Sequence, residues 1–142
     1  MECKVLEEQD LEMMLDFVDD ENTQYNVGDL RNFIGNNGNY GFIVKVDGKI
    51  IGFATAYILL KPNSKKVFYL DAIDIMADYR GNGYGAKLME FIRDYAKSLG
   101  CAEMFLVTNK SNTSACKCYE KTGGVSESQD DVVYVYNFEK LV

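Results

Sequence analysis

Three glycines alternate over five positions, directly before a segment with helical periodicity. Gly81, Gly83 and Gly85 belong to the run DYRGNGYGAKLM, residues 78–89. Because glycine loses more backbone freedom on folding than other residues, such a cluster favours a place where a ligand comes close to the main chain. A helix N-terminus offers unpaired N–H groups and about half a positive unit charge, which together bind phosphate. The run therefore predicts a phosphate-binding loop.

Two common phosphate loops do not fit this run. A P-loop needs a lysine followed by serine or threonine, whereas Lys87 is followed by Leu88. The dinucleotide fingerprint G-x-G-x-x-[GA] is matched in letters by Gly81, Gly83 and Ala86, but it belongs to the first unit of a parallel sheet. Hairpin strands are expected before this loop, so we interpret that match as accidental.

The side chains available for catalysis are limited. The 142-residue chain contains no histidine, which excludes Ser-His-Asp and Cys-His machinery and leaves carboxylate, tyrosine, lysine, thiol or water as acid and base. Two of its four cysteines, Cys116 and Cys118, form C-x-C and not the paired C-x-x-C of a zinc site. No metal is therefore expected.

Charge and hydropathy narrow the choice of partners. The net charge of −7 and the pI near 4.6 argue against a nucleic-acid binder and suit a cationic partner. No stretch approaches the length of a membrane span, and the start, MECKVLEEQD, lacks the apolar core of a signal peptide. We therefore expect a cytoplasmic protein with reduced thiols and no membrane or nucleic-acid partner.

The order of elements predicts one mixed α/β domain over residues 1–142. Asp47-Gly48 suits the positive φ values of a type I′ turn and joins two strands in a hairpin. The expected sheet is mostly antiparallel, with helices on both faces and a parallel crossover after the glycines. The expected strands are 2–6, 40–46, 49–60, 67–76, 101–109 and 131–139, and the expected helices are 8–20, 30–34, 88–99 and 112–121.

Two motifs in this order resemble those of the GNAT superfamily of N-acetyltransferases. The spacing Arg80-x-x-Gly83-x-Gly85 is similar to the family's [QR]-x-x-G-x-[GA] loop. Downstream, Asn112-x-x-Ala115-x-x-x-Tyr119-Glu120-Lys121-x-Gly123 resembles its N-x-x-A-x-x-x-Y-E-K-x-G signature, although Gly124 replaces the apolar residue that usually follows. The resemblance covers residues 40–125. Residues 56–89 are also similar to the aminoglycoside 3-N-acetyltransferases, in a layout that many small-amine acetyltransferases share.

The resemblance implies that acetyl-CoA is the acetyl donor. Successive N–H groups of the loop would bind its pyrophosphate, and the backbone of the preceding strand would hold the pantetheine arm. For Arg80 two roles stay open, a phosphate contact or an ion pair with a nearby carboxylate. The implied cofactor-binding residues are Ile73, Asp74, Ile75, Arg80, Gly81, Asn82, Gly83, Tyr84, Gly85, Ala86 and Asn112.

The resemblance also assigns the catalytic residues. A tyrosine at the position of Tyr119 supplies the proton for the leaving thiolate, and a phenol with a pKa near 10 is protonated at neutral pH. Asp71 stands where many relatives carry a glutamate that acts through water, so the base is Asp71 or an ordered water. Asp74 is a second candidate, but strand alternation places Asp71 and Asp74 on opposite faces.

Two acidic segments outside these motifs indicate the kind of acceptor. Asp16, Asp19, Asp20 and Glu21 lie in one segment, and Glu127, Asp130 and Asp131 in another. In this fold both segments flank the acceptor side, so we expect a small cationic amine such as an aminoglycoside or a polyamine. The alternatives are a protein or peptide N-acetyltransferase and a non-catalytic acyl-CoA-binding module. The strand expected at residues 131–139 could also pair across a homodimer.

Overall fold

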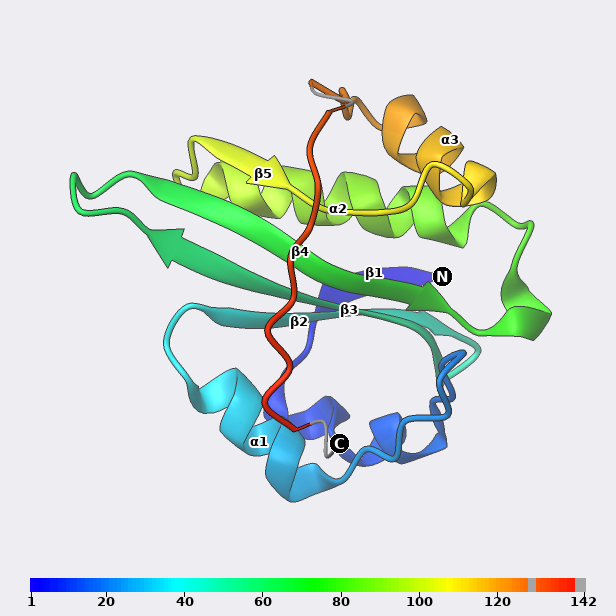
Figure 1. Ribbon diagram of the computed structural model, residues 1–142. Helices are drawn as coiled ribbons and strands as arrows, with labels where there is room; N and C mark the ends of the chain where they lie inside the picture. The colour runs from blue at the N-terminus through cyan, green and yellow to red at the C-terminus, as the bar shows by residue number, and fades with distance from the viewer. Residues whose placement is uncertain (128–129, 140–142) are drawn as a thin grey trace.

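A five-stranded mixed sheet organises the chain in the computed structural model, which describes residues 1–127 and 130–139 (Figure 1). The strands follow one another across the sheet in chain order, and each pair is antiparallel except the last, in which β4 and β5 are parallel. The predicted mixed α/β fold is confirmed. The strands are β1 (Glu2–Val5), β2 (Asn39–Val46), β3 (Lys49–Leu60), β4 (Lys66–Ile75) and β5 (Glu103–Phe105).

Helices cover both faces of this sheet, as expected (Figure 1). On one face, α2 (Tyr84–Ser98) packs on a core that includes Phe42, Phe68 and Ile92. It forms the crossover between β4 and β5, and α3 (Thr113–Lys121) lies beside it. On the other face, a second core lies under α1 (Val27–Gly35) and the 3-10 helices η1 (Glu8–Asp10) and η2 (Glu12–Asp16).

The β2–β3 hairpin forms where Asp47-Gly48 predicts it. The two residues have φ of 50° and 74°, the positive values that a type I′ turn requires. Further along, the 3-10 helix η3 (Ala77–Tyr79) leads from β4 into the glycines. The part of the chain that the structure describes holds no helix long and apolar enough to cross a membrane.

The helix predicted over residues 8–20 is wrong. The segment forms η1 and η2 instead, and although Leu11 and Met14 are buried, Leu15 and Val18 are exposed. Its backbone N–H groups bond to the carbonyl three residues back, as Met14 does to Leu11 at 3.1 Å, which makes the turns 3-10 and not α. The helical backbone ends at Phe17, which has a ψ of 133° and packs into the core under α1.

The strand predicted at residues 131–139 is also absent. These residues run as an extended, exposed segment from the side of α3 toward α1, across the direction of the strands (Figure 1). A strand requires a hydrogen-bonding neighbour, and residues 132–136 donate or accept no backbone hydrogen bond with any described residue. The sequence has strand character there, but none of the described strands pairs with residues 132–136.

Candidate active site

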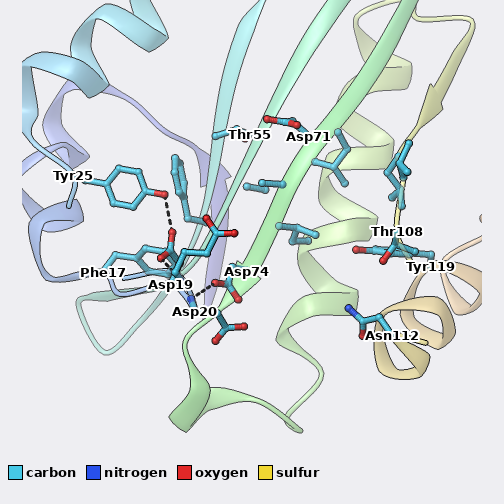
Figure 2. A pocket seen from close by; sticks show the side chains of 18 residues that line it. Phe17, Asp19, Asp20, Tyr25, Thr55, Asp71, Asp74, Thr108, Asn112 and Tyr119 are labelled. Carbon is cyan, nitrogen blue, oxygen red and sulfur yellow. Dashed lines mark hydrogen bonds between the residues drawn. The ribbon is translucent and has the colours of Figure 1, made fainter. Parts of the chain in front are cut away.

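A pocket of about 370 Å³ lies where β4 and β5 part (Figure 2). The two strands pair only as far as Tyr69 and Phe105, and beyond this point none of the described strands lies beside the outer edge of β4. One wall is the loop of residues 19–25, which we call the acidic loop, and the opposite wall is α3 with the segment after β5. The lining residues are Phe17, Asp19, Asp20, Glu21, Tyr25, Phe53, Ala54, Thr55, Leu70, Asp71, Ala72, Ile73, Asp74, Leu106, Val107, Thr108, Asn112 and Tyr119.

A β-bulge on β4 turns two carboxylates into this pocket. In the pairing with β3, Leu70 faces Ala56 and Ala72 faces Thr55, so Asp71 is the extra residue. The bulge shifts the alternation by one position, because Leu70 and Ile73, three residues apart, both pack into the core under α2. Asp71 and Asp74, which follow them, therefore both lie on the other face, and both line the pocket. The prediction that they lie on opposite faces is therefore wrong. Asp71 is exposed and accepts a hydrogen bond from the Tyr69 hydroxyl at 3.1 Å.

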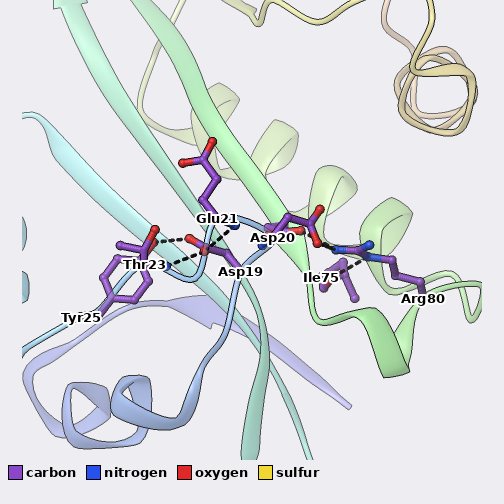
Figure 3. A network of polar contacts seen from close by, with 8 residues as sticks. Asp19, Asp20, Glu21, Thr23, Tyr25, Ile75 and Arg80 are labelled. Carbon is purple, nitrogen blue, oxygen red and sulfur yellow. Dashed lines mark hydrogen bonds and ion pairs between the residues drawn. The ribbon is translucent and has the colours of Figure 1, made fainter. Parts of the chain in front are cut away.

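The acidic loop is held in shape by Asp19 (Figure 3). Its carboxylate accepts hydrogen bonds from the backbone N–H groups of Glu21 and Thr23 and from the Tyr25 hydroxyl, at 3.1, 2.9 and 3.1 Å. Burial opposes the charge of Asp19, but these donors outweigh it and hold its pKa below the usual value. Burial and the neighbouring Asp19 charge raise the pKa of Tyr25 to about 12. Tyr25 therefore stays a hydrogen-bond donor at neutral pH.

Arg80 connects the acidic loop to the end of β4 (Figure 3). Its Nη2 lies 2.7 Å from Asp20 Oδ1 and 3.1 Å from Asp74 Oδ1, and its Nε donates to the carbonyl of Ile75 at 2.8 Å. The backbone N–H of Asp20 donates to the other oxygen of Asp74 at 3.0 Å. Burial and the charge of Asp20 raise the pKa of Asp74 against the opposing effect of Arg80. Of the two roles left open for Arg80, the geometry favours the ion pair with carboxylates.

The glycine loop (residues 80–86) presents free N–H groups at the start of α2. Gly81 and Gly83 have φ of 80° and 82°, and a Cβ on either would meet no atom within 4 Å. No described residue accepts a hydrogen bond from the backbone N–H groups of residues 81–86, and the first helical bond runs from Lys87 to Gly83 at 3.1 Å. The loop therefore has the open space and the donors that a phosphate group requires.

Tyr119 enters the pocket from α3. The helix starts at Asn112, whose side chain accepts a hydrogen bond from the backbone N–H of Ala115 at 3.2 Å, as a cap does. Burial raises the pKa of Tyr119 above its usual value, so its hydroxyl keeps its proton at neutral pH. Behind it, a Cβ on Gly124 would lie 2.9 Å from the Tyr119 carbonyl oxygen. This close approach explains why glycine stands where the related signature has an apolar residue.

Five of the thirteen predicted site residues line the pocket: Asp71, Ile73, Asp74, Asn112 and Tyr119. Arg80 is connected to it through its ion pairs with Asp20 and Asp74, whereas Ile75 and residues 81–86 are not among the lining residues. Of the two acidic segments, Asp19, Asp20 and Glu21 line it, but Asp16, Glu127, Asp130 and Asp131 do not. The sequence did not point to Phe17, Tyr25, Thr55 or Thr108, which share no local motif and meet only in the fold.

The comparisons with known proteins agree with this geometry. The model of the acetyltransferase (GNAT) family matches residues 7–124. The chain belongs to this family. GNAT acetyltransferases among the curated relatives include the thialysine N-epsilon-acetyltransferase of Mus musculus, 24% identical over 90 residues, which are 63% of this chain and 53% of that protein. The chain thus spans about half the length of the curated relatives it matches.

Solved structures of other GNAT proteins show the same fold. An aminoglycoside acetyltransferase from an uncultured soil metagenomic sample, in complex with trehalose, superposes with a TM-score of 0.81 at 22% identity, covering 96% of this chain and 94% of that chain. The aminoglycoside N-acetyltransferase AAC(6')-Iy in complex with CoA gives 0.74 at 22% identity, covering 96% and 98%. A ribosomal-protein-alanine N-acetyltransferase of Brucella melitensis gives 0.74 at 17% identity, covering 95% and 100%.

Proposed function

We propose that this GNAT acetyltransferase transfers the acetyl group of acetyl-CoA directly to a primary amine of a small polycationic acceptor, of the aminoglycoside or polyamine class. The observation that carries the proposal is the group of five carboxylates that line one pocket with Tyr119. A primary amine with a pKa near that of lysine, about 10.4, is cationic at neutral pH. Carboxylates in a confined pocket concentrate such cations.

The acetyl donor, acetyl-CoA, would bind at the glycine loop and along the edge of β4. When bound, acetyl-CoA supplies the activated thioester. The N–H groups of residues 81–86 would bind its pyrophosphate, because they are free, point from a helix N-terminus and have no side chain in front of Gly81 and Gly83. The unpaired outer edge of β4 at Ile73–Ile75 would hold the pantetheine arm, with Asn112 at the start of α3 beside it.

The nitrogen of an ammonium acceptor loses two protons, one before and one after it attacks, while the leaving thiolate gains one and the other is released to water. The amine nitrogen forms a bond to the thioester carbonyl carbon, the carbon–sulfur bond breaks, and the thiolate leaves. Asp71, directly or through an ordered water, takes the proton from the amine, since its carboxylate is exposed to the pocket and is bonded only by the Tyr69 hydroxyl among the described side chains. The Tyr119 hydroxyl gives a proton to the thiolate, because its raised pKa keeps it protonated.

Two features favour a small amine over a protein segment. The carboxylates of the acidic loop and β4 all line one pocket of about 370 Å³. The solved structures with this fold include an aminoglycoside acetyltransferase in complex with sisomicin. A ribosomal-protein-alanine N-acetyltransferase also shares the fold, so a peptide acceptor is the alternative to be tested.

The test is acetylation of an acceptor panel. The purified protein is incubated with acetyl-CoA and, in separate reactions, sisomicin, spermidine, thialysine or a peptide with a free N-terminus. Products are measured by mass spectrometry, because the four free cysteines would react with thiol reagents. Acetylated sisomicin or spermidine supports the proposal, whereas acetylated peptide alone would replace it with the protein-acceptor alternative. Binding of acetyl-CoA without any product would indicate an acyl-CoA-binding module.

A further inference from the structure

A row of four aromatic side chains crosses the sheet on the side of α1. Tyr57 on β3, Tyr69 on β4 and Phe105 on β5 are partners in register, so their rings follow one another across the strands. The ring centroids of Tyr57 and Tyr69 lie 6.4 Å apart and those of Tyr69 and Phe105 lie 4.9 Å apart, with interplanar angles of 26° and 24°. Phe33 of α1 contacts Tyr57 edge to face at 5.7 Å. We call these four residues the aromatic row.

The aromatic row fixes the hydroxyl of Tyr69. The Tyr69 ring is stacked between Tyr57 and Phe105, and aromatic pairs at such separations stabilise beyond the area that they bury. Because a tyrosine side chain has only two torsions, a fixed ring also fixes its hydroxyl oxygen. This hydroxyl donates to Asp71 Oδ1 at 3.1 Å. Burial and this hydrogen bond raise the pKa of Tyr69, so it remains a donor at neutral pH.

Asp71 depends on this partner because the sheet gives it little support. Asp71 is the extra residue of the β-bulge, so no residue of β3 faces it. On its other side, the pairing of β4 with β5 ends at Tyr69. Among the described residues, the Tyr69 hydroxyl is the only group that donates a hydrogen bond to the exposed carboxylate of Asp71. Without it, the side chain would change rotamer on the picosecond to nanosecond timescale, as exposed side chains do.

We propose that Tyr69 is a positioning residue for Asp71: the aromatic row fixes the hydroxyl, and the hydroxyl fixes the carboxylate that takes a proton from the acceptor amine. This inference rests on the proposed function, in which Asp71 is the base, directly or through a water. A base works only within hydrogen-bond reach of the proton that it removes, and small misplacements lower the rate steeply. None of the four residues of the row lines the pocket, so the row acts on the reaction only through Asp71.

The first test removes the hydroxyl and keeps the ring. With sisomicin or spermidine, whichever the wild type acetylates, Tyr69→Phe is expected to lower kcat about five- to tenfold, because a hydrogen bond to a charged acceptor is lost and water replaces only part of it. The KM for acetyl-CoA should not change, and the KM for the amine should change less than kcat. Tyr40→Phe is the matched control and should keep the wild-type kcat. Tyr40 belongs to an aromatic cluster on the α2 side, and its hydroxyl makes no hydrogen bond with a described residue.

The second test determines whether Tyr69 acts through Asp71. Asp71→Asn is expected to lower kcat by roughly a hundredfold, and adding Tyr69→Phe to it is expected to have no further effect, whereas the effects of independent residues would multiply. Phe105→Leu removes one stacked ring and is expected to lower kcat about two- to fivefold. In the Tyr69→Phe background, Phe105→Leu should have no effect on kcat.

The third test does not depend on acetyl transfer. Three-bond NMR couplings report the χ1 rotamer of Asp71, which is expected to be single in the wild type and averaged in Tyr69→Phe and in Phe105→Leu. Averaged couplings in the wild type would overturn the proposal even if the protein acetylates no amine.

The kinetic outcomes separate this proposal from the proposed function. If Asp71→Asn lowers kcat but Tyr69→Phe does not, the positioning role is wrong and Asp71 remains the base. Multiplying effects of Tyr69→Phe and Asp71→Asn, or an equal loss of kcat in Tyr40→Phe, would also overturn the positioning role. If Asp71→Asn keeps the wild-type kcat, the assignment of the base in the proposed function is wrong, and the positioning role with it.

Discussion

Arg80 and Asp20 form an ion pair at 2.7 Å although they stand 60 positions apart in the chain. Arg80 belongs to the loop that we propose binds the donor, and Asp20 belongs to the acidic loop that we propose binds the acceptor. Asp74, at the end of β4, contacts both residues. The two halves of the site are therefore tied together by one small polar network (Figure 3).

Loss of the ion pairs of Arg80 is expected to weaken binding of the acceptor amine more than binding of acetyl-CoA. In Arg80→Ala, Asp20 and Asp74 lose their cation and repel each other, so the acidic loop should move away from β4. The Arg80 side chain is partly exposed, so the loss is only about 0.5–1 kcal/mol, a two- to fivefold rise in the KM for the amine. Calorimetry with acetyl-CoA provides the check. A large loss of acetyl-CoA affinity would show that Arg80 binds phosphate instead.

Gly83 is expected to be required for the donor. Gly83→Val places a β-branched side chain at a φ of 82° and in the open space proposed for pyrophosphate. Acetyl-CoA affinity should fall by more than tenfold in calorimetry. Gly100→Val is the matched control, since Gly100 has a φ of 79° at the other end of α2, so its variant carries a similar backbone strain without blocking the loop. Equal acetyl-CoA affinities in the two variants would contradict the assignment of the loop.

Tyr119→Phe is expected to lower kcat by roughly a hundredfold, the lower end of the effect of a general acid. Acetyl-CoA affinity should stay nearly unchanged, because only the hydroxyl is removed. Since burial raises the pKa of Tyr119 above its usual value of 10, the wild-type rate should not decline from loss of this proton as pH rises from 6 to about 9. Single-turnover rates across this range measure the effect. An unaltered rate in Tyr119→Phe would leave the residue with a packing role only.

The parts of the site that lie in continuous motifs could be predicted from the sequence. The glycine loop and the capped helix at Asn112 are local, since each depends on residues within one or two turns of each other. The order of the two motifs along the chain was enough to indicate the fold. The hairpin at Asp47-Gly48 could be predicted because its turn is also local in sequence.

The parts that depend on pairing between distant segments could not be predicted. The bulge at Asp71 arises from a mismatch of register between β3 and β4, and no feature within β4 indicates it. Arg80 could be assigned a carboxylate partner only in general terms, because Asp20 is remote in sequence. Within the strand expected at residues 131–139, residues 132–136 make no backbone hydrogen bond with any described residue, and strand propensity alone does not supply a neighbouring strand.

Asp10 is expected to make a large contribution to stability. Its side chain is fully buried and lies 2.8 Å from Lys4 Nζ and 2.7 Å from Lys45 Nζ. Burial opposes its charge, but the hydrogen bonds from both lysines outweigh that effect and lower its pKa. Removal of one partner of a buried ion pair costs about 3–5 kcal/mol, and the partial exposure of both lysines places Asp10→Asn at or below the lower end of this range.

The pH dependence of this effect has a definite sign. Because the pKa of Asp10 is lower in the folded than in the unfolded chain, its stabilisation is fully present above the unfolded pKa near 3.9 and is lost as pH falls below it. The free energy of unfolding, measured in urea at pH 7 and near pH 3, should therefore differ more between wild type and Asp10→Asn at pH 7. If this difference in free energy grew on acidification, the ion pairs of Asp10 could not be its cause.

Glu21 provides the sharpest test of the proposed acceptor. Its carboxylate lines the pocket, and among the described residues it makes no side-chain hydrogen bond or ion pair, so Glu21→Gln changes charge with little effect on structure. The KM for a polyamine should rise by about two- to tenfold, and the increase should shrink at high salt, since charges in physiological salt are screened over about 8 Å. Asp16→Asn is the matched control, because Asp16 belongs to the same acidic segment but lies outside the pocket. If both variants raise KM equally, the general negative charge of the protein attracts the amine and the pocket does not select it.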